Sequence, residues 1–118
     1  MSVTTMVDRI AALNDHARHG LDRTAKLVIT HTCLATIAGD GSAVAELAAQ
    51  VRIFRAMREW TPPEGDRSER DLGYVQVDGH KIMFKVDYYA PDLQWGSEDP
   101  ADPEQTIRVI TVMLPGDY

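Results

Sequence analysis

An Asp-Gly pair between two alternating segments limits what this chain can fold into. Asp78 and Gly79 stand between residues 72–77 and residues 80–88. A pair of this kind predicts a tight hairpin, because both turn positions need a backbone conformation that aspartate and glycine adopt readily. In the second segment apolar side chains fall at every second position, starting at Ile82. We therefore expect two antiparallel strands with one buried face and one mostly hydrated face.

Two further segments predict helices. Apolar residues recur every three or four positions before Gly20, and Thr4 or Thr5 is placed to cap this first helix. The second predicted helix runs from Ser42 to Trp60, where Pro62 and Pro63 end it. Its expected apolar stripe is Val44, Leu47, Val51, Phe54 and Met57.

Residues 25–32 and 106–114 are rich in β-branched residues and predict two more strands. The second of these is apolar on both faces, which indicates a central position. The fold class is therefore α+β, in the order α-β-α-β-β-β. We expect a mostly antiparallel four-stranded sheet with both helices on one face.

The length of 118 residues suits one domain spanning 1–118. No apolar run reaches the roughly 20 residues that cross a bilayer, and residues 1–10 do not resemble a signal peptide. The single cysteine, Cys33, has no partner for a disulfide. A cytoplasmic location is the expectation. The net charge of −6 argues against a protein that grips nucleic acid over its whole surface.

The acidity is concentrated in the second half of the chain. Between Glu59 and Glu104 there are twelve acidic and four basic residues, a net charge of −8. Within this region, residues 90–105 form a long connection without predicted structure, and such connections are often functional. Acidic and aromatic side chains meet there, and the candidate partner-binding residues are Asp87, Tyr88, Tyr89, Asp92, Trp95, Glu98, Asp99, Asp102 and Glu104.

Three interpretations of this segment remain open. The carboxylates and aromatic side chains form a contact surface for a basic protein. Alternatively, the carboxylates bind a divalent cation, although the spacing lacks the pattern of an EF-hand. The simplest alternative is a hydrated crossover whose acidic residues only keep it soluble.

Three other groups of residues offer weaker hypotheses. His16 and His19 could share a helix face as zinc ligands, but no cysteine or His-Glu-x-x-His motif completes a site. His31 and Cys33 could act as base and nucleophile on one strand face, although a buried structural cysteine is commoner. The third group is a basic stripe of Arg52, Arg55 and Arg58. It would bind phosphate or another protein, or pair with the acidic loop of the chain itself.

The C-terminal half resembles a known family. The segments that carry the resemblance are 87–97 (DYYAPDLQWGS), 99–103 (DPADP) and 106–114 (TIRVITVML), with weaker similarity at 9–15 (RIAALND) and 77–79 (VDG). They resemble the bacterial family called domain of unknown function 3768, whose members are small proteins of alphaproteobacteria and their mobile elements. The resemblance implies no reaction and no cofactor. It implies a setting in which small proteins often act on host defence or replication.

Charge, aromatic content and resemblance together predict a small acidic non-enzymatic binding protein of a mobile genetic element. It would occupy a basic surface of a host nucleic-acid-binding or defence protein, in the manner of anti-CRISPR or anti-restriction proteins, as a monomer or homodimer. No direct contact with nucleic acid or membrane is expected. The alternatives are a metal-dependent small enzyme that uses loop carboxylates with His16 or His80, or a homodimeric accessory protein.

Overall fold

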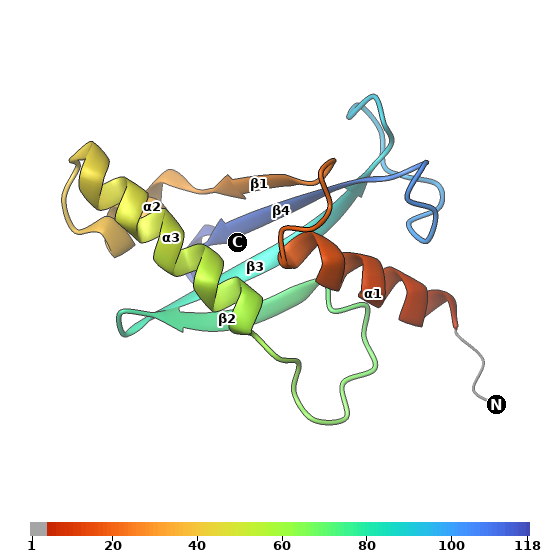
Figure 1. The fold of residues 1–118 in the computed structure, drawn as a ribbon, viewed down its shortest axis with the longest axis horizontal. Helices are drawn as coiled ribbons and strands as arrows, with labels where there is room; N and C mark the ends of the chain where they lie inside the picture. The colour runs from red at the N-terminus through yellow and green to blue at the C-terminus, as the bar shows by residue number, and fades with distance from the viewer. Residues whose placement is uncertain (1–4) are drawn as a thin grey trace.

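The Asp-Gly hairpin is present as predicted in the computed structural model, which describes residues 5–118 (Figure 1). Asp78 and Gly79 adopt φ angles of 52° and 81°, the left-handed pair that a two-residue hairpin turn requires. The elements in chain order are α1 (Met6–Arg18), β1 (Lys26–Ile29), α2 (His31–Ala38), α3 (Ala43–Glu59), β2 (Leu72–Val77), β3 (His80–Tyr89), β4 (Ile107–Met113) and the short 3₁₀ helix η1 (Pro115–Asp117).

The four strands form one sheet in the order β1-β4-β3-β2. The β2/β3 and β3/β4 pairs are antiparallel, but β1 runs parallel to β4. The sheet is therefore mixed, and the expectation of a mostly antiparallel sheet was wrong. The cause is the path after β1: α2 and α3 carry the chain across to the far edge, where β2 begins, and the last strand returns between β3 and β1.

Helix α2 was not predicted. The strand expected over residues 25–32 ends at Ile29, and the side chain of Thr30 accepts a hydrogen bond from the backbone N–H of Cys33, which begins a helix. His31 and Cys33 thus lie in a helix and not on a strand. The chain order becomes α-β-α-α-β-β-β. The β-branched residues up to Thr32 made residues 25–32 resemble one strand, although the last two residues of that range already belong to α2.

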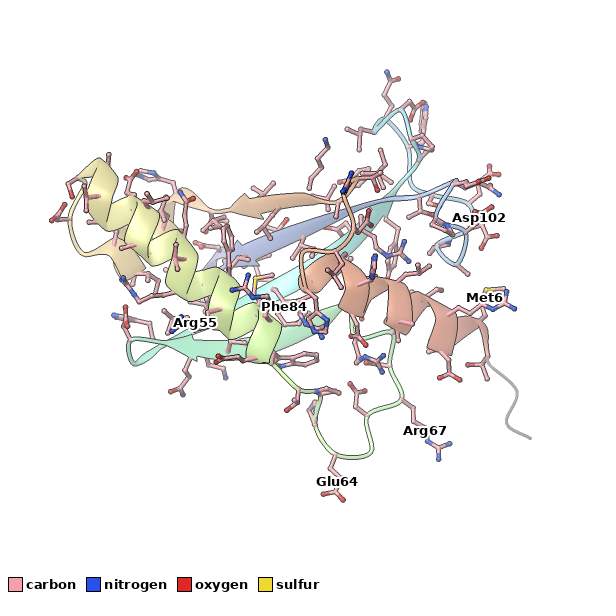
Figure 2. All side chains as sticks on the ribbon, viewed as in Figure 1. Met6, Arg55, Glu64, Arg67, Phe84 and Asp102 are labelled. Atoms are coloured by element: carbon pink, nitrogen blue, oxygen red, sulfur yellow. The ribbon has the colours of Figure 1, made fainter. Side chains whose placement is uncertain are left out.

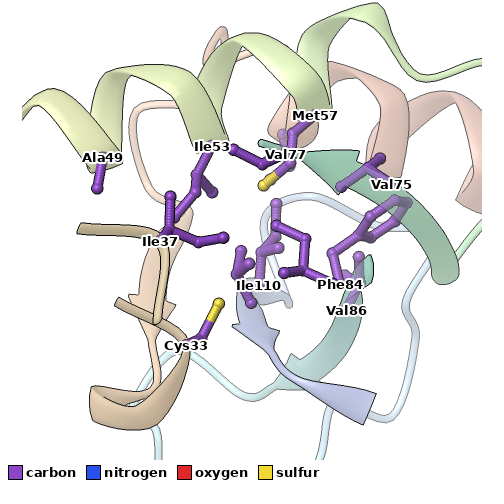
Figure 3. Close-up of a cluster of buried hydrophobic side chains, with 13 residues drawn as sticks. Cys33, Ile37, Ala49, Ile53, Met57, Val75, Val77, Phe84, Val86 and Ile110 are labelled. Atoms are coloured by element: carbon purple, nitrogen blue, oxygen red, sulfur yellow. The ribbon is translucent and has the colours of Figure 1, made fainter. Parts of the chain in front are cut away.

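The hydrophobic core lies between the sheet and all three helices (Figure 3). Its fully buried members include Phe84, Ile53 and Val112. The other face of the sheet, which we call the open face, carries Lys85, Asp87 and Tyr89, the residues that alternate with the core positions of β3.

The predicted apolar stripe of α3 does not coincide with its buried face. Ala49, Ile53 and Met57 face the core, whereas Val44 and Leu47 are 80% and 63% exposed. Val51 is exposed as well, and Phe54 is half-buried. The helix itself is confirmed, with Ser42 as its N-cap, but most of the stripe that suggested it faces solvent.

Helix α1 buries polar side chains together with apolar ones. Ile10 and Ala17 contact the core side, and Asn14 and Arg18 are buried beside them. The side chain of Thr5 caps this helix by accepting from the N–H of Asp8 at 3.0 Å, whereas Thr4 lies outside the described residues. The guanidinium of Arg18 stacks over the ring of Trp60 at 4.8 Å.

Candidate functional site

The segment between β3 and β4, residues 90–105, is folded and is called the acidic loop below. Its first half extends β3 as a small turn. The backbone N–H of Ala90 donates to Trp95 O at 2.7 Å, and that of Ser97 donates to Tyr88 O at 3.0 Å. The loop projects from the end of the sheet farthest from α2 (Figure 1). Hydrogen bonds within the chain therefore define the backbone conformation of this part of the loop.

Three predicted acidic side chains stabilise turns of the loop. Asp92 Oδ1 accepts from the N–H of Gln94 at 3.0 Å, and Asp99 Oδ1 accepts from the N–H of Ala101 at 3.2 Å. Asp102 accepts from the N–H of Glu104 at 2.9 Å and from the side-chain amide of Gln105 at 2.8 Å. These carboxylates therefore stabilise the backbone conformation of the loop.

The remaining three predicted residues of the acidic loop meet at one place. Trp95, Glu98 and Glu104 line a shallow hollow of about 310 Å³, and the indole of Trp95 is 71% exposed. Within residues 5–118, no arginine or lysine forms an ion pair with any carboxylate of the acidic loop. The hollow thus combines an exposed aromatic ring with uncompensated negative charge.

The three predicted residues in β3 lie elsewhere. Asp87 pairs with Lys85 on the open face at 3.2 Å, and this contact raises the pKa of Lys85. Tyr89 is also on the open face, beside Leu93. Tyr88 points the other way, into the interior, so the exposed part of the candidate site does not include it.

A buried arginine, which was not predicted from the sequence, anchors the acidic loop. Arg108 in β4 is 1% exposed. Its Nη2 donates to the backbone oxygen of Pro100, and its Nε donates to Asn14 Oδ1 at 2.7 Å. Thr106 Oγ1 donates to Asp99 O at 2.8 Å beside it. Burial lowers the pKa of the Arg108 guanidinium. The only sequence signal is an arginine within an otherwise apolar central strand.

The same network continues through Tyr88. Asn14 Nδ2 donates to the Tyr88 hydroxyl at 2.8 Å, and this hydroxyl donates to Glu69 Oε2 at 2.7 Å. Burial, with Glu69 close by, raises the pKa of Tyr88 far above its ordinary value. Tyr88 therefore stays protonated and joins α1, β3 and the segment before β2 into one hydrogen-bonded unit.

Asp15 completes the connection between α1 and the segment before β2. Arg70 donates to both of its oxygens, at 2.9 and 2.6 Å, and Arg18 donates to Oδ1 at 2.9 Å. Partial burial would raise the pKa of Asp15, but these two guanidinium groups lower it below its ordinary value. This carboxylate is an internal ion-pair partner and is not available to a ligand.

The other candidate groups do not form sites. His16 and His19 are exposed at the end of α1, His31 is exposed while Cys33 is buried, and His80 is exposed at the hairpin turn. Burial raises the pKa of the Cys33 thiol to about 11, which is the opposite of what a nucleophile needs. In the part of the chain that the structure describes, no three histidine, cysteine or acidic side chains are grouped as a metal site requires.

The three arginines of the predicted basic stripe on α3 differ in their contacts. Arg52 pairs with Asp78 of the hairpin turn at 2.8 Å and also donates to Ile37 O at 3.1 Å. Arg55 and Arg58 are exposed, and no ion pair involves either of them in the structure of residues 5–118. Figure 2 places Arg55 far from Asp102 of the acidic loop, so internal pairing with this loop, the simpler alternative, does not occur.

Comparison with known proteins agrees with the resemblance in sequence. No helix among residues 5–118 is long and apolar enough to cross a bilayer. No curated protein and no solved structure matches the chain. The family model described as "Protein of unknown function (DUF3768)" matches residues 30–117. This range includes β2, β3, β4 and the acidic loop, but neither β1 nor residues 9–15. Since this match covers most of the chain, the protein belongs to the DUF3768 family.

Proposed function

We propose that the protein is a non-enzymatic binding protein that uses the acidic loop to occupy a basic surface of a host protein. The observation that supports this most directly is the hollow formed by Trp95, Glu98 and Glu104. Its carboxylates have no cationic partner within the described residues, and its tryptophan is exposed. Aromatic anchors beside complementary charge are typical of the strongest contacts in protein interfaces.

The order of the acidic loop favours binding. Arg108, Thr106 and the carboxylates of Asp99 and Asp102 hold its backbone in place before any partner arrives. A preorganised loop loses less conformational entropy on binding than a flexible one, so more of the contact energy appears as affinity. The negative charge of the loop would accelerate encounter with a basic surface and make the affinity depend on salt.

The basic surface is of the kind that otherwise holds nucleic acid. Carboxylates on an ordered loop can take the place of phosphates against arginine and lysine side chains. Such a protein competes with nucleic acid for its host target, as anti-restriction and anti-CRISPR proteins do. The setting in a mobile genetic element comes from the family resemblance.

The test compares two sets of variants with matched chemistry. Glu98→Gln with Glu104→Gln removes the charge of the hollow, and Trp95→Ala removes its aromatic ring. Glu64→Gln and Glu59→Gln change two exposed carboxylates elsewhere and serve as controls. Asp99 and Asp102 are left intact because their loss would disturb the loop itself.

The measurement has two steps. Tagged protein first captures candidate partners from host extract, and each purified partner is then titrated against labelled nucleic acid with the protein as competitor. We expect the wild type and the controls to displace the nucleic acid, and the hollow variants to do so at least about tenfold less well. Equal competition by the hollow variants, or no captured protein that binds nucleic acid, would reject the proposal.

A further inference from the structure

Strand β1 is an exposed edge with free backbone groups. Among residues 5–118 it pairs only with β4, and the N–H of Thr30 donates to Val112 O at 2.9 Å. Because backbone groups alternate in direction along a strand, those of Lys26 and Val28 point toward β4 as well. The N–H and C=O groups of Leu27 and Ile29 therefore point away from the sheet.

This edge is apolar on both faces of the sheet. Leu27, on the helix side, is 41% exposed and borders a cavity of about 310 Å³ that Phe54 and Met57 also line. Val28, on the open face, is 47% exposed beside Tyr89 in a second hollow of about 300 Å³. Apolar edge strands invite pairing with a further strand, and natural monomers usually protect them.

The exposed apolar row of α3 adjoins the same edge. Leu47 lies two helical turns before Phe54, so it is on the side of α3 that faces the cavity next to β1. Val44 and Val51 are adjacent to it, and all three of these residues are more than half exposed. The exposed apolar side chains of α3 thus lie on the side of this helix that faces the cavity bordered by Leu27.

We propose that a second copy of this chain covers this edge through antiparallel pairing of β1 with the partner's β1. A two-fold axis perpendicular to the sheet at Val28 makes the edge self-complementary, as a closed dimer requires. Leu27 then lies opposite the partner's Ile29, and the outward N–H and C=O groups of both residues pair. The two sheets become continuous, and both α3 helices lie on the same side of it.

Charge complementarity supports the second copy over an unrelated strand. In this register Lys26 lies opposite the partner's Thr30, on the open face. The Thr30 hydroxyl donates to Asp117 Oδ2 at 2.9 Å, so the Lys26 ammonium approaches the partner's Asp117 carboxylate. Neither Lys26 nor Asp117 has an ion-pair partner among the described residues of its own chain. The two-fold axis forms this contact twice.

The inference does not depend on the function proposed above, and the experiment needs no host partner. Sedimentation equilibrium over a concentration series gives the dimer dissociation constant. Lys26→Glu and Val28→Lys change exposed side chains of the edge, and Arg67→Glu is the matched control because Arg67 is exposed far from β1 (Figure 2). Circular dichroism verifies that each variant is folded.

We expect a wild-type dimer that Lys26→Glu and Val28→Lys each weaken by at least about tenfold, while Arg67→Glu leaves it unchanged. Combining Lys26→Glu with Asp117→Lys restores the affinity, since the charges are exchanged. Hydrogen exchange provides the second readout, because the amides of Leu27 and Ile29 become protected only in the dimer. A monomer at every concentration up to about 1 mM overturns the proposal, as does a dimer that both edge variants leave intact.

Discussion

The side-chain oxygen of Asn14 accepts a hydrogen bond from Nε of Arg108 across 2.7 Å, within the contact between α1 and β4. Asn14 is fully buried, and its amide nitrogen serves Tyr88 and the backbone of Glu69 at the same time. One amide therefore satisfies partners from three separate parts of the chain. Because Arg108 also holds Pro100, the position of the acidic loop depends on this contact.

Asn14→Ala should destabilise the protein strongly. The substitution leaves the buried Arg108 guanidinium without its acceptor and removes a donor from Tyr88, so we expect a loss of about 3 kcal/mol in the free energy of unfolding. Urea denaturation measures it. Gln76→Ala, an exposed change in β2, should stay within about 0.5 kcal/mol. A loss below about 1 kcal/mol for Asn14→Ala would show that the network contributes little.

Gly73→Ala should be destabilising for a steric reason. A Cβ at this position would lie 2.6 Å from Phe84 Cε1 and 2.8 Å from the ring of Trp60, whose edge-to-face contact fills the space over β2. We expect a cost of about 1–3 kcal/mol in thermal or urea unfolding. Gly41→Ala is the control, because no heavy atom lies within 4 Å of its Cβ. It should be neutral or stabilising by up to about 1 kcal/mol. Equal effects of the two substitutions would contradict the packing described here.

The two tryptophans should differ sharply in their contribution to stability. Trp60 packs against Phe84 and Arg18, so Trp60→Ala should cost about 3–5 kcal/mol. Trp95→Ala removes an exposed ring and should change the free energy of unfolding by less than about 0.5 kcal/mol. Urea denaturation of both variants measures these two changes in the free energy of unfolding. If Trp95→Ala is as damaging as Trp60→Ala, the indole of Trp95 has a structural role instead of a free surface.

Cys33 should be unreactive in the folded protein. Burial, together with the nearby Asp117 carboxylate, raises its pKa to about 11, so almost no thiolate exists at pH 8. Iodoacetamide should alkylate it slowly in buffer and rapidly in denaturant, as mass spectrometry would record. Since the folded pKa exceeds the ordinary value of 9.0, the stability contributed by the neutral thiol is complete below pH 9 and is lost as the pH rises toward 11. Cys33→Ser should not show this loss of stability between pH 9 and 11, because it has no thiol to ionise. Rapid alkylation of the folded protein at pH 8 would refute the burial of the thiol.

Asp15 should make the protein sensitive to acid. Its pKa lies below the ordinary value of 3.8, so the ionised form stabilises the fold at higher pH, and this contribution is lost as the pH falls through the folded pKa. Asp15→Asn should therefore be less stable than the wild type at pH 7, and the difference should shrink below about pH 4. Thermal unfolding across this range tests it. A constant difference at all pH values would mean that the charge of Asp15 is unimportant.

Local features of the fold were predictable from the sequence, and contacts between distant segments were not. The Asp78-Gly79 hairpin and the extent of α3 follow from short-range patterns. The buried side of α3 does not, because Val44 and Val51 are apolar yet exposed. The parallel pairing of β1 with β4 joins Lys26 to Val109, which is distant in sequence, and a hydrophobic pattern cannot specify such a neighbour.

The candidate site was predictable to a similar degree. The composition of the acidic loop identified Trp95, Glu98 and Glu104, which do share one hollow. It could not separate them from Asp99 and Asp102, whose carboxylates bind the loop's own backbone. Asn14 and Arg108 were missed because polar residues are ordinarily exposed, and their partnership spans 94 positions.

The placement of β4 has a consequence for biosynthesis. The ribosome makes β1 before the other described strands, but among them β1 pairs with β4 alone, and β4 is made after the other three. Until residues 107–113 have left the exit tunnel, β3 lacks one of its two neighbours and the helices have only half a sheet to cover. Nascent chains halted before this point should be recognised by chaperones and degraded by proteases, and native structure should appear in a single late step.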